Sequence, residues 1–195
     1  MAMKYGKPGC LLQKADRGQF LSFSLGCMLC LYLGILFLAQ LDWQRVCRTS
    51  DRMEDALACS NLAAMVVDLK ELGSTGQVRL CEPDRVFPLF LSALRDNLSL
   101  DENLMAVSSD LISSQVQLEC FQIYNVGDTR VEILEWKNGL FERSQALPGQ
   151  VVTPMGDRVE KTGIYSEISF DNKGILGQVY RARKGKLVDV TAERS

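Results

Sequence analysis

Residues 20–39 read FLSFSLGCMLCLYLGILFLA, a run of twenty positions without a single Asp, Glu, Lys or Arg. Its only ionisable side chains belong to two cysteines and one tyrosine, which stay neutral in an apolar environment. A helix rises about 1.5 Å per residue, so a run of this length spans the roughly 30 Å hydrocarbon core of a bilayer. The run therefore predicts a transmembrane helix, to which we assign residues 19–42.

The charges on the two sides of this run are unequal. Residues 1–19 carry a net charge of +3, whereas the rest of the chain sums to -5. Because positive charge stays on the cytoplasmic side, the sequence predicts a cytoplasmic leader at 1–18 and an extracytoplasmic C-terminal part. We thus expect a single-pass protein of the cell membrane, with Trp43 as its aromatic anchor at the interface.

Two other interpretations of the apolar run are weaker. A cleaved secretory signal has an apolar region of about 7 to 15 residues followed by small residues. The run here is longer, and Phe37 and Ala39 make a poor cleavage site. A buried core helix is the third interpretation.

An amphipathic pattern follows the apolar run, which predicts a helical extension over 43–76. Its stripe recurs at steps of three and four: Trp43, Val46, Ser50, Met53, Leu57, Ser60, Ala64 and Val67. Packing on the chain's own domain is favoured over an intermolecular coiled coil, because the stripe holds many small polar members. The helix is expected to end at the glycines of 73–76.

Residues 77–195 predict an α+β domain. A short helix is expected at 84–98, and the pattern then changes to a period of two, with a phase slip after Cys120 that suggests a bulge. Asn138-Gly139 predicts a tight hairpin, and a further hairpin is expected around 148–157. The last strands are expected at GIYSEISF (163–170) and on both sides of a turn at Lys184-Gly185. The fold class is α+β, with helices on one face of an antiparallel meander of four to seven strands.

The composition excludes much of enzyme chemistry. The 195 residues form one ordinary domain with an appendage, and they contain no histidine, which removes Ser/His/Asp and Cys/His catalysis and His-containing zinc sites. A net charge of -2 argues against a nucleic-acid-binding surface. We expect no catalytic residues, cofactor, metal or small-molecule substrate, and hence no enzyme.

Seven cysteines are distributed over the chain. Cys27 and Cys30 form a C-x-x-C, but within the lipid span they act as small apolar residues, since no second pair completes a metal site. Cys47 and Cys59 are separated by about 18 Å of helix and cannot pair with each other. A disulfide between Cys81 and Cys120 is a hypothesis for the outer domain.

Small side chains recur at every fourth position of the apolar run, at Ser22, Gly26, Cys30 and Gly34. Such a stripe lets helix backbones approach closely. The sequence therefore predicts packing against a membrane helix of another subunit, although Gly, Ser and Cys are also ordinary residues of membrane helices.

A short basic leader ends in Arg17-Gly18-Gln19-Phe20-Leu21, immediately ahead of the apolar run. With this motif, the chain resembles type IV pilins and pseudopilins, and most closely the TadE-like minor pseudopilins of tight-adherence (Flp-type) pilus systems. The resemblance implies that a prepilin peptidase cuts after Gly18 and leaves Gln19 as the new N-terminus. At the fifth position after the cut, where pilins carry glutamate, this chain has Phe23.

The resemblance implies a pilin-like fold and a structural role in assembly or priming of a type IV or Tad-type pilus or a related secretion apparatus. The partners would be the membrane, other pilin or pseudopilin subunits and the assembly machinery. The first alternative is a signal-anchored extracytoplasmic binding domain that never enters a filament. A membrane-tethered hydrolase using carboxylates is the second.

Overall fold

The computed structural model describes residues 12–107, 112, 115–174 and 177–190, with side chains from residue 20 onward. The chain divides into two compact units, Met1–Gln44 and Arg45–Ser195. The helices are α1 (Leu12–Ala64), α2 (Leu69–Thr75) and α3 (Pro83–Leu98). The strands are β1 (Gln117–Val126), β2 (Val131–Lys137), β3 (Leu140–Ala146), β4 (Gly163–Lys173) and β5 (Val179–Asp189). The α+β class is thus confirmed, and α3 matches the helix expected at 84–98.

Helix α1 ends at Ala64, earlier than the predicted end of the extension at 76. The reason is a short pairing between the segments 66–68 and 79–81, in which Cys81 N donates to Val66 O and Asp68 N donates to Arg79 O, both over 2.8 Å. The Asp68 side chain then caps α2, and Gly76 ends α2 at a φ of 72°. The glycine stop is therefore real, but it ends α2 instead of α1.

The sheet is antiparallel, with strand order β3-β2-β1-β4-β5. Strands β1, β2 and β3 are joined as consecutive neighbours, and β4 then returns to the free side of β1, so the sheet is not the simple meander that was expected. The predicted bulge lies in β1, where the register with β4 shifts between Leu118 and Cys120. The tight turn at Asn138-Gly139 has positive φ angles of 51° and 87°, as predicted.

Two turn predictions in the C-terminal part are wrong. Residues 147–162 form a connection with one isolated bridge, Val152 to Arg158, instead of a hairpin of regular strands. Lys184-Gly185 lies inside the single strand β5, paired with Ile168 and Glu167 of β4. Gly185 is required there because a Cβ atom would collide with the Tyr165 hydroxyl and would lie 2.7 Å from Met155 Sδ.

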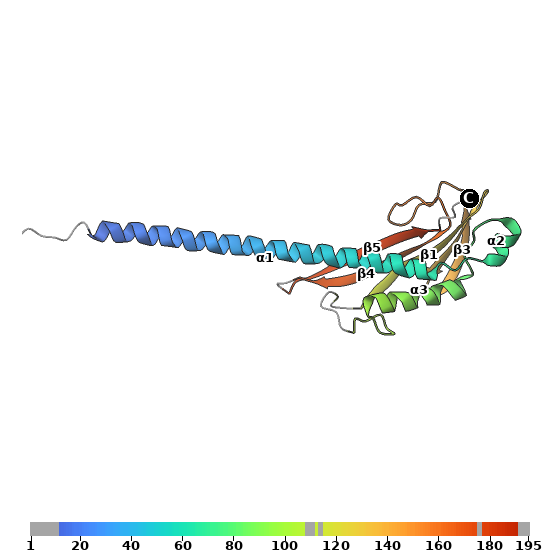
Figure 1. Ribbon diagram of the computed structural model, residues 1–195, viewed down its shortest axis with the longest axis horizontal. Coiled ribbons are helices and arrows are strands. Elements are labelled where there is room, and N and C mark those ends of the chain that lie inside the picture. The colour runs from blue at the N-terminus through green and yellow to red at the C-terminus, as the bar shows by residue number, and fades with distance from the viewer. Residues whose placement is uncertain (1–11, 108–111, 113–114, 175–176, 191–195) are drawn as a thin grey trace, which may run out of the picture. The chain divides into compact units, whose positions relative to one another are not determined.

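The main core lies between one face of the sheet and the helices, as Figure 1 shows for α3 and the last part of α1. In the stripe of α1, Met53, Leu57, Ser60 and Ala64 are fully buried, so packing on the chain's own domain is confirmed for this part. The β4 residues Ile164, Ser166, Ile168 and Phe170 are all buried. Aromatic rings close the core: the Phe87 centroid lies 5.1 Å from that of Phe121 and 4.5 Å from that of Trp136.

The opposite face of the sheet has a smaller core under the 147–162 connection. Val151 and Val159 from this connection pack with Tyr124, Val131 and Tyr165 of the sheet, and all five side chains are buried. The connection therefore acts as a strap that covers part of this face.

Asn61 is a buried polar residue of α1 that contacts the sheet directly. Its Nδ2 donates to Lys186 O over 2.9 Å and to Ile164 O over 3.4 Å, and its Oδ1 accepts from Ser166 Oγ over 2.8 Å. The neighbouring Ser60 Oγ accepts from Asn97 Nδ2 of α3 over 3.2 Å. Two adjacent polar residues of α1 thus bond to the sheet on one side and to α3 on the other.

Replacing Asn61 with alanine should lower the free energy of unfolding by about 2 kcal/mol, because the Ser166 hydroxyl and a carbonyl lose their partner away from water. The measurement is denaturant unfolding of the full chain in detergent. Asn103→Ala, at an exposed loop position, is the matched control and should change the free energy by less than about 0.5 kcal/mol. Equal effects of the two substitutions would contradict the role given to Asn61.

Candidate functional site

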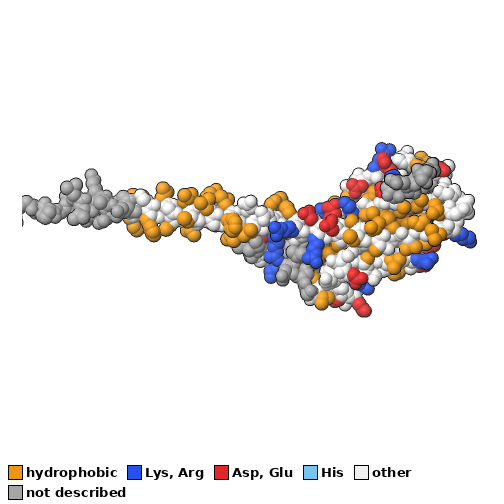
Figure 2. All heavy atoms as spheres, in the orientation of Figure 1, with side chains coloured by type: hydrophobic (Ala, Val, Ile, Leu, Met, Phe, Trp, Pro, Cys, Tyr) orange, Lys and Arg blue, Asp and Glu red, His pale blue; other side chains and the backbone are white. Residues whose placement is uncertain are grey.

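The first candidate site is the apolar part of α1 in the unit Met1–Gln44. Among the described residues, the stretch from Phe20 is the only helix long and apolar enough to cross a membrane. Its large side chains are exposed, for example 74% for Phe20 and 69% for Leu31, and Figure 2 shows no charged side chain among them. Exposure of so many apolar side chains is unfavourable in water, which favours a lipid environment for this helix.

The predicted packing stripe lies on this exposed helix. Ser22, Gly26, Cys30 and Gly34 are all exposed, and a Cβ atom added at either glycine would meet nothing within 4 Å. A shallow apolar groove runs beside Cys30 and Gly34 and is lined further by Cys27, Leu31, Ile35, Phe37 and Leu38. Trp43, the predicted interface anchor, is 68% exposed. The helix surface is thus open to a partner helix or to lipid.

The predicted cleavage position, Gly18 and Gln19, lies within α1, where the structure describes the backbone and not the side chains. The leader residues 1–11 lie outside the described residues.

The predicted disulfide is absent, since Cys81 and Cys120 are both free thiols. Cys81 is buried in the main core between helices and sheet, whereas Cys120 packs against the smaller core on the other face. The bulge in β1 explains this, because the register shift between Leu118 and Cys120 leaves Leu118 against the main core and puts Cys120, two residues later, against the smaller core. Burial also raises the pKa of the Cys120 thiol to about 12, so it is protonated at neutral pH and is a poor nucleophile.

Cys27 and Cys30 are free thiols on the apolar helix, and no group of three or more Cys, Asp or Glu side chains within the described ranges could hold a metal ion.

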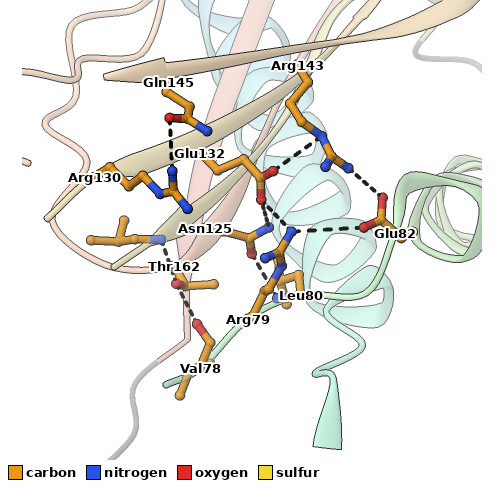
Figure 3. A network of polar contacts seen from close by, with 11 residues as sticks. Val78, Arg79, Leu80, Glu82, Asn125, Arg130, Glu132, Arg143, Gln145 and Thr162 are labelled. Carbon is orange, nitrogen blue, oxygen red and sulfur yellow. Dashed lines mark hydrogen bonds and ion pairs between the residues drawn. The ribbon is translucent and has the colours of Figure 1, made fainter. Parts of the chain in front are cut away.

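The second candidate site is a polar network in the unit Arg45–Ser195, drawn in Figure 3. Its centre is the Glu132 carboxylate of β2, whose side chain is only 13% exposed. Arg79 Nη2 lies 2.7 Å from Glu132 Oε2, and Arg143 Nε lies 3.3 Å from Glu132 Oε1. Arg143 also contacts Glu82 over 2.9 Å, so two arginines and two glutamates form one connected set.

The same region fixes the connection between α2 and α3 to the sheet. Leu80 N donates to Asn125 Oδ1 over 2.8 Å, and the Thr162 hydroxyl donates to Val78 O over 2.9 Å (Figure 3). The side chains of Asn125 and Thr162 thus satisfy backbone groups of residues 78–80 that a neighbouring strand would otherwise bond. The network therefore has a clear structural role, which is to hold this connection on the sheet.

A hollow of about 320 Å³ opens beside the network, between the α2–α3 connection and the β1–β2 turn. Besides Arg79, Asn125 and Glu132, its polar lining includes Arg130, whose Nη1 reaches Gln145 Oε1 over 3.4 Å, and Asp128, which accepts from Gln77 over 3.1 Å. Donors and acceptors of both charges line it, so its surface can take a polar group and would disfavour an apolar one.

The polar network was not predicted from the sequence, although one signal pointed to it. Alternation along β2 puts Glu132 on the same face as Leu134 and Trp136, which belong to the main core. A carboxylate on a core face needs a cationic partner. The arginines that supply it, Arg79 and Arg143, are 53 residues before and 11 residues after it, and only the fold brings them together.

No family model, curated protein or solved structure matches the chain. Fold and sites define its class as an α+β domain with a five-stranded antiparallel sheet, preceded by one candidate membrane-spanning helix.

The substitution Glu132→Gln should lower the free energy of unfolding by about 1–2 kcal/mol, because it removes the charge that holds Arg79 and Arg143. The expected loss is smaller than for a fully buried pair, since the two arginine side chains are 36% and 51% exposed. Glu160→Gln is the control: this side chain is 67% exposed and lies 3.8 Å from Arg158, so a change below about 0.5 kcal/mol is expected in the same unfolding assay. A Glu132 variant as stable as the Glu160 variant would show that the network adds nothing.

Proposed function

We propose that the chain is a membrane-anchored, pseudopilin-like structural protein that acts in assembly or priming of a type IV or Tad-type pilus or a related secretion apparatus. It is anchored by its apolar helix as a single-pass protein of the cell membrane. Its N-terminus lies in the cytoplasm and its sheet domain lies outside. It works by packing and has no catalytic activity.

The observation that carries this proposal is the composition of α1. The helix contains an apolar run with exposed side chains, and its residues from Arg45 onward pack on an antiparallel sheet through Met53, Leu57 and Ala64. An apolar helix followed by an amphipathic half on a β-sheet is the arrangement that the resemblance to pilins implies. The Arg17-Gly18-Gln19 motif stands at the point where that family is processed.

The mechanism would use the apolar helix surface as the contact with neighbouring subunits. Ser22, Gly26, Cys30 and Gly34 leave the backbone accessible along one stripe, and close approach gives van der Waals contact that lipid tails cannot match. Prepilin peptidase would act before this step, at Gly18. Phe23 in place of the usual glutamate means that entry into an assembly would depend on packing instead of on charge pairing at that position.

A second candidate function is a signal-anchored extracytoplasmic binding domain that is not incorporated into a filament. The polar hollow beside Arg79 and Arg130 favours it, because a concave site with both donors and acceptors suits a polar ligand or a polar side chain of a partner.

Mass spectrometry of the mature protein's N-terminus separates the two functions. The pseudopilin proposal predicts a chain that begins at Gln19, and it predicts that Gly18→Val blocks this cut. Gly26→Val is the control, since Gly26 lies within the apolar run and its replacement should leave the cut unchanged. A mature chain that still begins at Met1, or that is cut far from Gly18, would reject processing as a pilin and favour the binding domain.

A further inference from the structure

Two large side chains are exposed near the end of the β4–β5 hairpin. Val179 is 58% and Tyr180 is 48% exposed, and both stand at the start of β5, the strand at the edge of the sheet. In the register with β4, Val179 is opposite Lys173, which is also exposed. The Tyr180 hydroxyl is turned to solvent and donates to Gln178 over 3.0 Å. Val179, Tyr180 and Lys173 thus lie together at this end of the β4–β5 hairpin, which we call the hairpin tip.

This tip lies at the same end of the domain as the first residue of its helix. Glu54 of α1 contacts Lys184 over 3.3 Å and Lys186 over 2.7 Å, and Asn61 contacts Lys186 O, so β5 and α1 run in the same direction. From Lys184 back to Tyr180 the strand covers about 13 Å, which corresponds to about nine residues of helix. Tyr180 is therefore roughly level with Arg45, where the unit Arg45–Ser195 begins.

Chain length then places this end close to the membrane. Arg45 follows Leu41, the last apolar residue of the predicted span, by four positions, so the two residues are separated by at most about 14 Å of chain. The headgroup layer adds about 5–8 Å beyond the hydrocarbon core on each side. Residues 41–45 belong to α1, and four residues of helix rise only about 6 Å, so a tip level with Arg45 is within reach of lipid headgroups.

The charges at this end also suit a lipid surface. Lys173 and Arg48 are exposed and form no ion pair with the described residues, whereas Arg181 contacts Ser169 over 3.1 Å and Glu119 over 3.7 Å. Figure 2 shows Lys and Arg side chains gathered at the end of the domain where its helix begins. Lipid phosphates attract such cations, and Tyr with an adjacent apolar side chain is enriched at the membrane interface.

We propose that the β4–β5 hairpin tip is a second membrane contact, in which Val179 and Tyr180 enter the headgroup layer and Lys173 lies beside lipid phosphates. The occupant is the bilayer that holds the anchor helix. The contact would limit the tilt of the domain on its helix. The inference rests on the membrane span of the proposed function and does not depend on a role in a pilus.

Photolabelling of the full chain in phosphatidylcholine–phosphatidylglycerol vesicles tests this contact. A trace lipid carries a diazirine next to its headgroup, and trypsin releases the hairpin tip as peptide 174–181, the strap as peptide 144–158 and the anchor as peptide 18–45. The expected result is label in peptide 174–181 several-fold above that in peptide 144–158. Val179→Asp should reduce this label, whereas Val152→Asp, at a strap valine of 60% exposure, should leave it unchanged.

Equal label in peptides 174–181 and 144–158, with clear label in peptide 18–45, would overturn the contact and leave the membrane anchor intact. Absence of label from peptide 18–45 would overturn the membrane span itself, and the contact with it. The comparison of wild-type peptides remains informative if the Val179 variant does not fold. Since no subunit partner is present in the vesicles, neither result bears on the pilus role.

Discussion

The domain depends on the hydrogen bonds of Asn61, because the buried side of α1 offers little apolar surface. Among the α1 side chains that the structure describes, Met53 and Leu57 are the only large apolar ones that are fully buried, and most of the other buried ones are small or polar. Apolar contacts of this kind allow a helix to slide or rotate on a sheet. A buried amide that bonds to Ser166 Oγ and Lys186 O fits only one position, and a buried polar residue of this sort is a known way to specify register.

Ion pairs also hold the helices in position on the sheet. Glu54 of α1 binds Lys186 and Lys184 of β5, and hydrogen bonds from these two lysines lower the pKa of its carboxyl. In β2, on the other side of the sheet's centre, Glu132 contacts Arg79 and Arg143 and so fixes the connection that leads into α3. The two glutamates and Asn61 together position α1 and α3 on one face of the sheet. On the other face, the strap covers part of the sheet with Val151 and Val159.

The sequence predicted what depends on local pattern and missed what depends on distant pairing. The apolar run, α3, the bulge in β1 and the Asn138-Gly139 turn follow from hydropathy period and turn chemistry, and all are present. The end of α1 was missed because the pairing of Val66 with Cys81 overrides helix propensity, and the β5 glycine was taken for a turn because its neighbour Tyr165 lies far away in sequence. For the same reason the Glu132 network was not foreseen.

The proposed function requires that the apolar run spans the membrane and that the unit Arg45–Ser195 lies outside the cell membrane. Cys59 is an exposed free thiol of that unit, so a membrane-impermeant maleimide added to intact spheroplasts tests the claim directly, with the labelled cysteine identified by mass spectrometry. In the Gly18→Val variant, which is expected to keep its leader, we expect Cys59 to be labelled in intact spheroplasts and Cys10 of the leader only after lysis. Labelling of Cys10 in intact spheroplasts, with Cys59 labelled only after lysis, would contradict the orientation on which the proposed function depends.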